Sequence, residues 1–119
     1  MYFENIDFSA YKLDLKQLTS IMENHGMVLA GQWDYERVTY DYKFEIKEGI
    51  YYLRIPGVAI EGDVGSGKAI IQTKKPYLGK HYYPHGVEYG EDEHFPEHLV
   101  KKCKEILSQI EQELKTFSN

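Results

Sequence analysis

A glycine-rich stretch, EGDVGSGKAII at residues 61–71, resembles a phosphate-binding loop. Gly62, four further residues, and then Gly67 and Lys68 follow the G-x-x-x-x-G-K-[ST] pattern, but Ala69 stands where a Ser or Thr would bind Mg²⁺. A P-loop also requires a helix directly after it, whereas AIIQTKK is rich in strand-forming residues. We therefore interpret the stretch as a solvent-exposed turn between two antiparallel strands, with Lys68 beginning the second strand.

Four of the five histidines lie in a short span with several carboxylates, a combination that can bind zinc or iron. Pro84 separates the first pair, so these two histidines should not share a helical turn. His94 precedes Pro96 and lies outside the predicted helix that carries His98. We therefore expect polar loop histidines. The alternative, a metal-assisted hydrolase, requires at least three of the following side chains to converge: His81, His85, Glu88, His94 and His98.

Two other titratable side chains lie on or beside predicted helices. Cys103 is on the apolar stripe of the C-terminal helix, where burial would raise the pKa of its thiol and leave it a small, unreactive hydrophobe. His25 follows the first helix, and we expect an exposed side chain that interacts favourably with the helix dipole. Neither position predicts a catalytic nucleophile, and the chain's single cysteine excludes an internal disulfide.

The chain contains eleven tyrosines in 119 residues. A tyrosine-rich sheet face would explain this content, and an aromatic binding surface is the alternative. The stretch GQWDYERVTYDYKF places Trp33 among charged residues at a strand–turn–strand junction, where it either caps the core or lines a polar pocket. If a cleft binds a ligand, the expected lining is Trp33, Tyr35, Arg37, Tyr82, Tyr83 and His85.

The composition predicts one globular domain, residues 1–119, that is able to bury its own core. A net charge of −5 disfavours binding to nucleic acid, because an acidic domain repels phosphate backbones. The first residues show no basic region followed by an apolar run, so we expect no signal peptide, and no apolar run is long enough to cross a membrane. We therefore expect a cytoplasmic protein with no membrane partner.

Hydrophobic periodicity predicts the elements of the first half of the chain. After a short strand in YFENIDFSAY, the segment DLKQLTSIMENHG predicts a helix that Asp14 caps and that Gly26 ends. A strand in MVLAGQW follows. RVTYDYKFEI then alternates strictly between apolar and polar residues, which predicts a strand with one buried face. The chain turns at Glu48-Gly49 and returns in IYYLRIPGVAIE, where Pro56-Gly57 predicts a bulge or an edge position.

The second half begins with the strand KAIIQTKK. The following segment, PYLGKHYYPHGVEYGEDEHF, reads as irregular, with local pairing between residues near Tyr82 and Val87. From Pro96 onward, a long helix is predicted. Its apolar stripe is long enough to require a sheet as its partner. The stripe consists of Leu99, Val100, Cys103, Ile106, Leu107, Ile110, Leu114 and Phe117.

The predicted order is strand, helix, four strands, helix, an α+β fold in which helices cover one face of an antiparallel sheet. The stretches GQWDYERVTYDYKFE and PYLGKHYYPHGVEYG resemble the YugN-like family, small proteins of Gram-positive spore-forming bacteria. The resemblance spans nearly the whole chain. It implies a TBP-like fold with a curved antiparallel sheet and two helices on one face. It carries no established activity, so no functional residue is carried over. The motifs of the sequence predict no cofactor.

The expected function is binding without catalysis. An aromatic-rich sheet under a long helix can form a cleft for a small ligand or a protein partner. The metal-assisted hydrolase is the first alternative. Homodimerisation through a sheet edge or the tyrosine-rich surface is the second.

Overall fold

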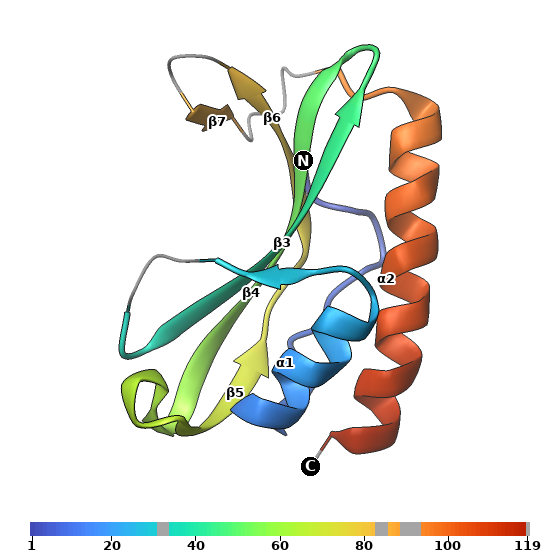
Figure 1. Cartoon of the computed structure of the whole chain (residues 1–119). Helices are drawn as coiled ribbons and strands as arrows, with labels where there is room; N and C mark the ends of the chain where they lie inside the picture. The colour runs from blue at the N-terminus through green and yellow to red at the C-terminus, as the bar shows by residue number, and fades with distance from the viewer. Residues whose placement is uncertain (31–33, 83–85, 89–93, 119) are drawn as a thin grey trace.

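The structure is a computed structural model that describes residues 1–30, 34–82, 86–88 and 94–118. The described residues form one seven-stranded sheet and two α-helices, and both helices lie on the same side of the sheet (Figure 1). The elements are β1 (Lys12–Asp14), α1 (Leu15–Asn24), β2 (Val28–Leu29), β3 (Arg37–Ile46), β4 (Gly49–Asp63), a 3₁₀ turn (Val64–Ser66), β5 (Lys68–Thr73), β6 (Tyr77–Tyr82), β7 (Gly86–Glu88) and α2 (Glu97–Phe117).

The long strand β4 organises the sheet. Every pairing is antiparallel, and the strand order is β1-β5-β4-β3-β2, with β6 added to β4 and β7 added to β6. On one side β4 pairs with β3 along most of its length. On the other side its first half pairs with β6 and its second half with β5. β5 and β6 therefore act as one strand that is interrupted at residues 74–76.

Pro56 lies at the point where β4 changes partner from β6 to β5. Its carbonyl accepts a hydrogen bond from the Lys74 amide at 2.9 Å, so its nitrogen also points toward the interruption between the two strands. A proline without an N–H is tolerated there, because no continuous ladder requires a donor. The bulge expected at Pro56-Gly57 lies further along β4, between Ala59 and Glu61.

Helix α1 begins and ends as its sequence predicts. The Asp14 carboxylate accepts hydrogen bonds from the amides of Lys16 and Gln17 at 3.1 and 3.3 Å. Gly26 follows the helix at φ +81°, a conformation that other residues rarely adopt. The prediction of an exposed His25 was wrong: its imidazole is largely buried and hydrogen-bonds to the carboxylate of Glu113 on α2. The contact joins the two helices.

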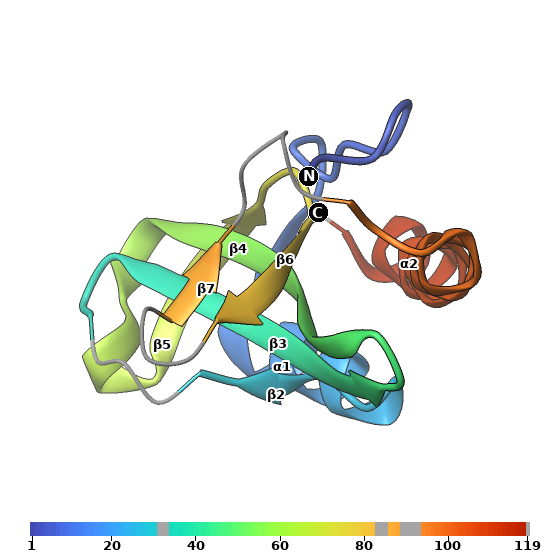
Figure 2. The ribbon, with the colours of Figure 1, turned by 90° about the horizontal axis from the view of Figure 1, so that it is seen from above.

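Helix α2 packs its apolar stripe onto the inner face of the sheet and the flank of α1. Figure 2 looks nearly along α2 and shows it lying beside the sheet. Cys103 is fully buried, and burial raises the pKa of its thiol to about 12. Phe117 is an exception to the predicted stripe, because it is 45% exposed at the end of the helix. The buried residues of α2 are Leu99, Cys103, Ile106, Leu107, Ile110 and Leu114.

Two expectations about strands were wrong. The first strand is not in residues 2–11, where Tyr2 forms only an isolated bridge to Tyr77; β1 begins at Lys12. Residues 77–82 were expected to be irregular but form β6. The local pairing near Tyr82 is confirmed, since Tyr82 faces Gly86. Six strands, not four, therefore lie between the two helices among the described residues.

The glycine-rich stretch is a turn between antiparallel strands, as predicted. Asp63 faces Lys68 across the β4–β5 ladder, and Lys68 begins β5 with an exposed side chain. Gly62 and Gly67 both have positive φ, +69° and +75°. A Cβ on Gly62 would lie 2.1 Å from the Lys68 carbonyl oxygen, so only glycine fits there. The Asp63 carboxylate closes the turn by accepting a hydrogen bond from the Ser66 amide at 2.8 Å.

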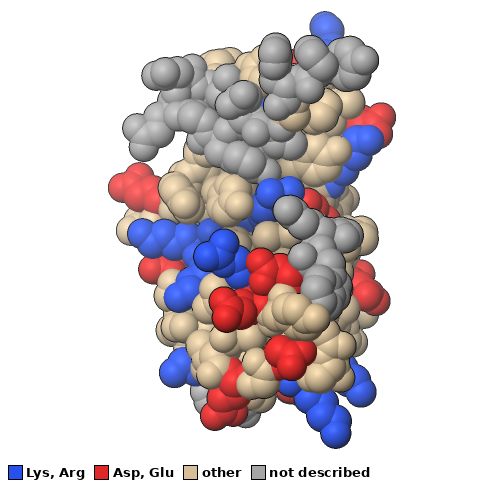
Figure 3. Space-filling view, turned by 90° about the vertical axis from the view of Figure 1, so that its left-hand side faces the viewer, with Lys and Arg blue, Asp and Glu red and all other residues tan. Residues whose placement is uncertain are grey.

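The side of the molecule opposite α2 carries charges of both signs (Figure 3). On the outer face of the sheet, Arg54 donates two hydrogen bonds to Asp41 across the β3–β4 ladder, at 2.6 and 2.8 Å. Both side chains are partly buried, which favours this bidentate ion pair over an exposed one. No helix in the described part of the chain is both long and apolar enough to cross a membrane.

Candidate functional site

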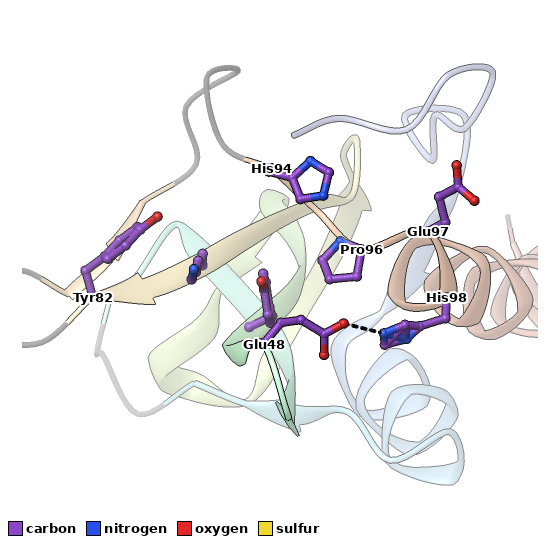
Figure 4. A pocket seen from close by; sticks show the side chains of 8 residues that line it. Glu48, Tyr82, His94, Pro96, Glu97 and His98 are labelled. Carbon is purple, nitrogen blue, oxygen red and sulfur yellow. Dashed lines mark hydrogen bonds and ion pairs between the residues drawn. The ribbon is translucent and has the colours of Figure 1, made fainter.

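A pocket of about 920 Å³ lies where the β3–β4 turn, β6 and the first turn of α2 meet (Figure 4). Its volume is within the range of small-molecule sites, roughly 300–1,000 Å³. We call it the α2 pocket. It is lined by Glu48, Tyr51, Lys80, Tyr82, His94, Pro96, Glu97 and His98.

Lys80 is the cation of the α2 pocket, and three neighbours hold it in place. Its register partner on β4 is Tyr51, so the two side chains share the inner face of the sheet. The Lys80 ammonium lies 5.8 Å from the centroid of the Tyr51 ring and 5.2 Å from that of Tyr82. A Cβ on Gly49 would lie 3.3 Å from Lys80 Cε, so the glycine leaves room for the lysine stem. Such cation–π contacts contribute about 0.5–1 kcal/mol each.

An ion pair crosses the opposite side of the α2 pocket. The imidazole Nε2 of His98 lies 3.0 Å from Oε2 of Glu48, and Figure 4 shows the two side chains reaching toward each other from α2 and from the β3–β4 turn. Because a carboxylate only accepts, the imidazole N–H is the donor. The side chains are 58% and 43% exposed, so the pair contributes little to stability. A ligand can therefore displace it at small cost.

The start of α2 adds backbone donors. Pro96 is the N-cap and makes no side-chain capping bond, while its carbonyl accepts hydrogen bonds from the amides of Leu99 and Val100 at 3.1 Å each. The preceding two amides, those of Glu97 and His98, belong to the orphan donors that every helix start presents. These amides favour acceptor atoms of a ligand, while the neighbouring carboxylates of Glu48 and Glu97 oppose a negative charge at this end of the pocket.

The described members of the expected ligand lining do not come together. Tyr82 lines the α2 pocket. Tyr35 and Arg37 lie at the other end of β3, where Arg37 faces Val58 on β4 and lines a different hollow with Asp34. Among the described residues, the α2 pocket shares only Tyr82 with the lining expected from the sequence. The remaining members, Trp33, Tyr83 and His85, lie outside the described residues.

The described members of the expected metal site also lie in different places. His81 is on β6, one residue from Lys80, so its ring lies on the outer face and makes an edge contact with Tyr52 at 6.1 Å. His94 and His98 both line the α2 pocket. His85 and the side chain of Glu88 lie outside what the structure describes. Within the described residues, no group of three His, Cys, Asp or Glu side chains is placed to hold a metal ion.

Five residues of the α2 pocket were not among the candidate site residues of the sequence analysis: Glu48, Tyr51, Lys80, Pro96 and Glu97. A signal was present for Lys80. Leu78, Lys80 and Tyr82 alternate with the period of a strand, and Leu78 is fully buried, so Lys80 belongs to the face that carries a core residue. The glycines and histidines of the segment led to the interpretation as a loop, which hid this alternation.

The surroundings of Lys68 differ from those of a phosphate site. A hollow of about 360 Å³ includes Lys68, but it also includes the carboxylates of Asp14 and Glu61, which repel phosphate. The residues after Lys68 form a strand, so no helix N-terminus is directed at this hollow by the segment that follows it.

Comparison with known proteins gives a consistent result. The sequence model of the YugN-like family matches residues 5–111. The chain is 56% identical over 114 residues to the uncharacterized protein YlbA of Bacillus subtilis (strain 168), covering 96% of this chain and 95% of YlbA. It is 31% identical over 64 residues to the uncharacterized protein YugN of the same organism, covering 54% of this chain and 48% of YugN. A crystal structure of the uncharacterized conserved protein YugN from Geobacillus kaustophilus HTA426 is similar with a TM-score of 0.84 and 52% identity, covering 98% of this chain and 96% of that chain.

Proposed function

Because the chain belongs to the YugN-like family, whose name carries no activity, we propose a function from geometry alone: the α2 pocket binds a small anionic ligand with a planar portion. One observation supports this most directly. Lys80 is held between Tyr51 and Tyr82 in a pocket of about 920 Å³. A positioned cation beside aromatic rings is suited to a carboxylate or phosphate on a planar group.

The charges of the α2 pocket restrict how such a ligand is oriented. Glu48 and Glu97 are at the α2 side of the pocket and repel a negative group, whereas Lys80 attracts it from β6. Tyr51 is only 1% exposed and serves as the floor, while the half-buried Tyr82 offers a ring face. The anionic group therefore sits at Lys80 and the planar portion lies along Tyr82. We propose binding without a chemical step.

The proposal is tested by thermal shift with a panel of aromatic carboxylates and phosphorylated metabolites. A ligand at 100 times its Kd stabilises the fold by about 2.7 kcal/mol, which is readily seen. Lys80→Met keeps the aliphatic stem but removes the charge, and we expect affinity to decrease by about tenfold. The matched control, Lys68→Met, removes an exposed lysine at the other end of β4. Equal affinities in the two variants, or no saturable binding by any anion of the panel, would contradict the proposal.

Homodimerisation is a second candidate function, and the exposed edge strand β2 favours it. β2 is last in the strand order, and its Val28 and Leu29 are 66% and 39% exposed. Exposed apolar residues on an edge strand favour pairing with another chain. Light scattering tests this: a dimer that Val28→Lys converts to monomer supports the candidate, and a monomeric wild type excludes it.

We propose a TBP-like classification for the fold. A curved antiparallel sheet with two helices on one face supports it. A systematic structural superposition onto members of that fold class would test it, and a different strand order in those members would contradict it.

A further inference from the structure

A second hollow lies beside the start of α2, and it is distinct from the α2 pocket. Its volume is about 330 Å³. Val100 lines it, whereas His98 lines the α2 pocket. The positions of His98 and Val100 differ by about 200° around the helix axis, so the hollows extend to different sides of α2, and Glu97 lies on the border that they share. We call the second hollow the flank groove. Its lining consists of Phe95, Glu97, Val100, Lys101 and Lys104.

The floor of the flank groove is apolar and anchored to the core. Phe95 is half-buried, and its ring centroid lies 5.9 Å from that of the buried Tyr51. Val100 is also half-buried and belongs to the same packed cluster. A ligand that covers these two side chains would remove apolar area from water, at about 25 cal/mol per Å².

The rim of the flank groove is cationic at one end. Lys101 and Lys104 are exposed and three residues apart, so they are neighbours on the helix surface. Neither forms an ion pair within the part of the chain that the structure describes. Glu97 lies at the other end, about 10 Å from Lys104 along the helix axis. The groove therefore has a direction, with its carboxylate end near Glu97 and its lysine end near Lys104.

We propose that the flank groove is a separate site for a small amphiphilic carboxylate. The hydrocarbon portion covers Phe95 and Val100, and the carboxylate interacts with Lys101 and Lys104. The volume is at the lower end of ligand sites, so a short chain fits better than a long one. The reverse orientation is less favourable, because it would bring the ligand carboxylate next to Glu97.

Sodium octanoate is the test ligand, measured by isothermal titration calorimetry with 1-octanol as the uncharged comparison. The variant Lys101→Gln/Lys104→Gln should bind octanoate about tenfold more weakly, since two charge-assisted contacts are lost. The matched control is Lys102→Gln, an exposed lysine between the two that points to another side of α2. It should change the affinity by less than about twofold. Octanol should bind more weakly than octanoate to the wild type and equally to all variants.

Three results would overturn the inference. One is the absence of saturable octanoate binding up to about 10 mM, a concentration that corresponds to negligible affinity. Another is an equal loss of affinity in the double variant and in Lys102→Gln, which would show only a general effect of charge. The last is loss of octanoate binding in Lys80→Met, which would place the ligand in the α2 pocket and leave the proposed function intact. Circular dichroism confirms that each exposed-site variant is folded.

Discussion

Two Gly-Lys pairs lie at opposite ends of β4 and have opposite surroundings. Gly67-Lys68 completes a sequence that resembles a P-loop, yet Lys68 is exposed at the start of β5, beside Asp14 and Glu61. Gly79-Lys80 belongs to no motif, yet Lys80 lies between two tyrosine rings in a pocket of about 920 Å³. The comparison shows that the elements packed around a lysine determine its surroundings. A pattern of neighbours in sequence is not sufficient.

The largest expected effect concerns the turn before Lys68. Gly62→Ala should destabilise the fold by at least about 3 kcal/mol, because it combines a positive φ with a backbone clash. Gly67→Ala is the matched control: its φ is also positive, but no atom lies within 4 Å of an added Cβ, so we expect about 1 kcal/mol. Urea denaturation measures both. Similar losses in the two variants would show that the turn is not as tightly fixed as the structure indicates.

The buried Tyr40 should make the free energy of unfolding depend on pH, so the stabilities of variants at the two ends of β4 are compared below pH 10. Burial raises the pKa of its phenol from 10.0 to about 12, so the folded state keeps a proton that the unfolded state loses first. The stabilisation is fully present below pH 10 and is lost as the pH rises toward 12, by about 3 kcal/mol at most. Denaturant midpoints at pH 8 and 11 should differ strongly in the wild type and less in Tyr40→Phe. Tyr2→Phe, at a 65% exposed position, should behave as the wild type does.

Lys80→Ala should reduce stability by about 1 kcal/mol even without ligand. The variant loses the contacts of the ammonium with two rings and the packing of the stem over Gly49. The free energy of unfolding from urea titrations at pH 8 measures the change. A loss no larger than that of Lys68→Ala would mean that Lys80 is not held in the absence of ligand.

The smallest effect is expected at Lys68. Lys68→Ala should change the free energy of unfolding by no more than about 0.5 kcal/mol, since the side chain is exposed. ATP or GTP with Mg²⁺ should not raise the melting temperature. A rise that Lys68→Ala abolishes would restore the phosphate-loop interpretation and remove the contrast between the two lysines.

The fold was largely predictable, because periodic elements dominate it. The alternation in residues 37–46 and the capped helix after Asp14 correspond directly to β3 and α1. β6 was missed because its glycine and histidine are typical of loops, while pairing with β4 overrides that preference. The site was less predictable. Glu48 and His98 are fifty residues apart, and only the approach of α2 to the β3–β4 turn brings them together.

Because β5 and β6 pair with different halves of β4, the sheet can assemble in stages as the chain folds. β3, β4 and β5 are consecutive, and short turns connect them, so their pairing requires little loop closure. The β3–β4–β5 meander can therefore form early. We expect α2 to dock later, because its buried stripe packs against the sheet and α1, which are distant from it in the chain. Because the walls of the α2 pocket come from the β3–β4 turn, β6 and α2, we expect the pocket to be complete only after α2 has docked.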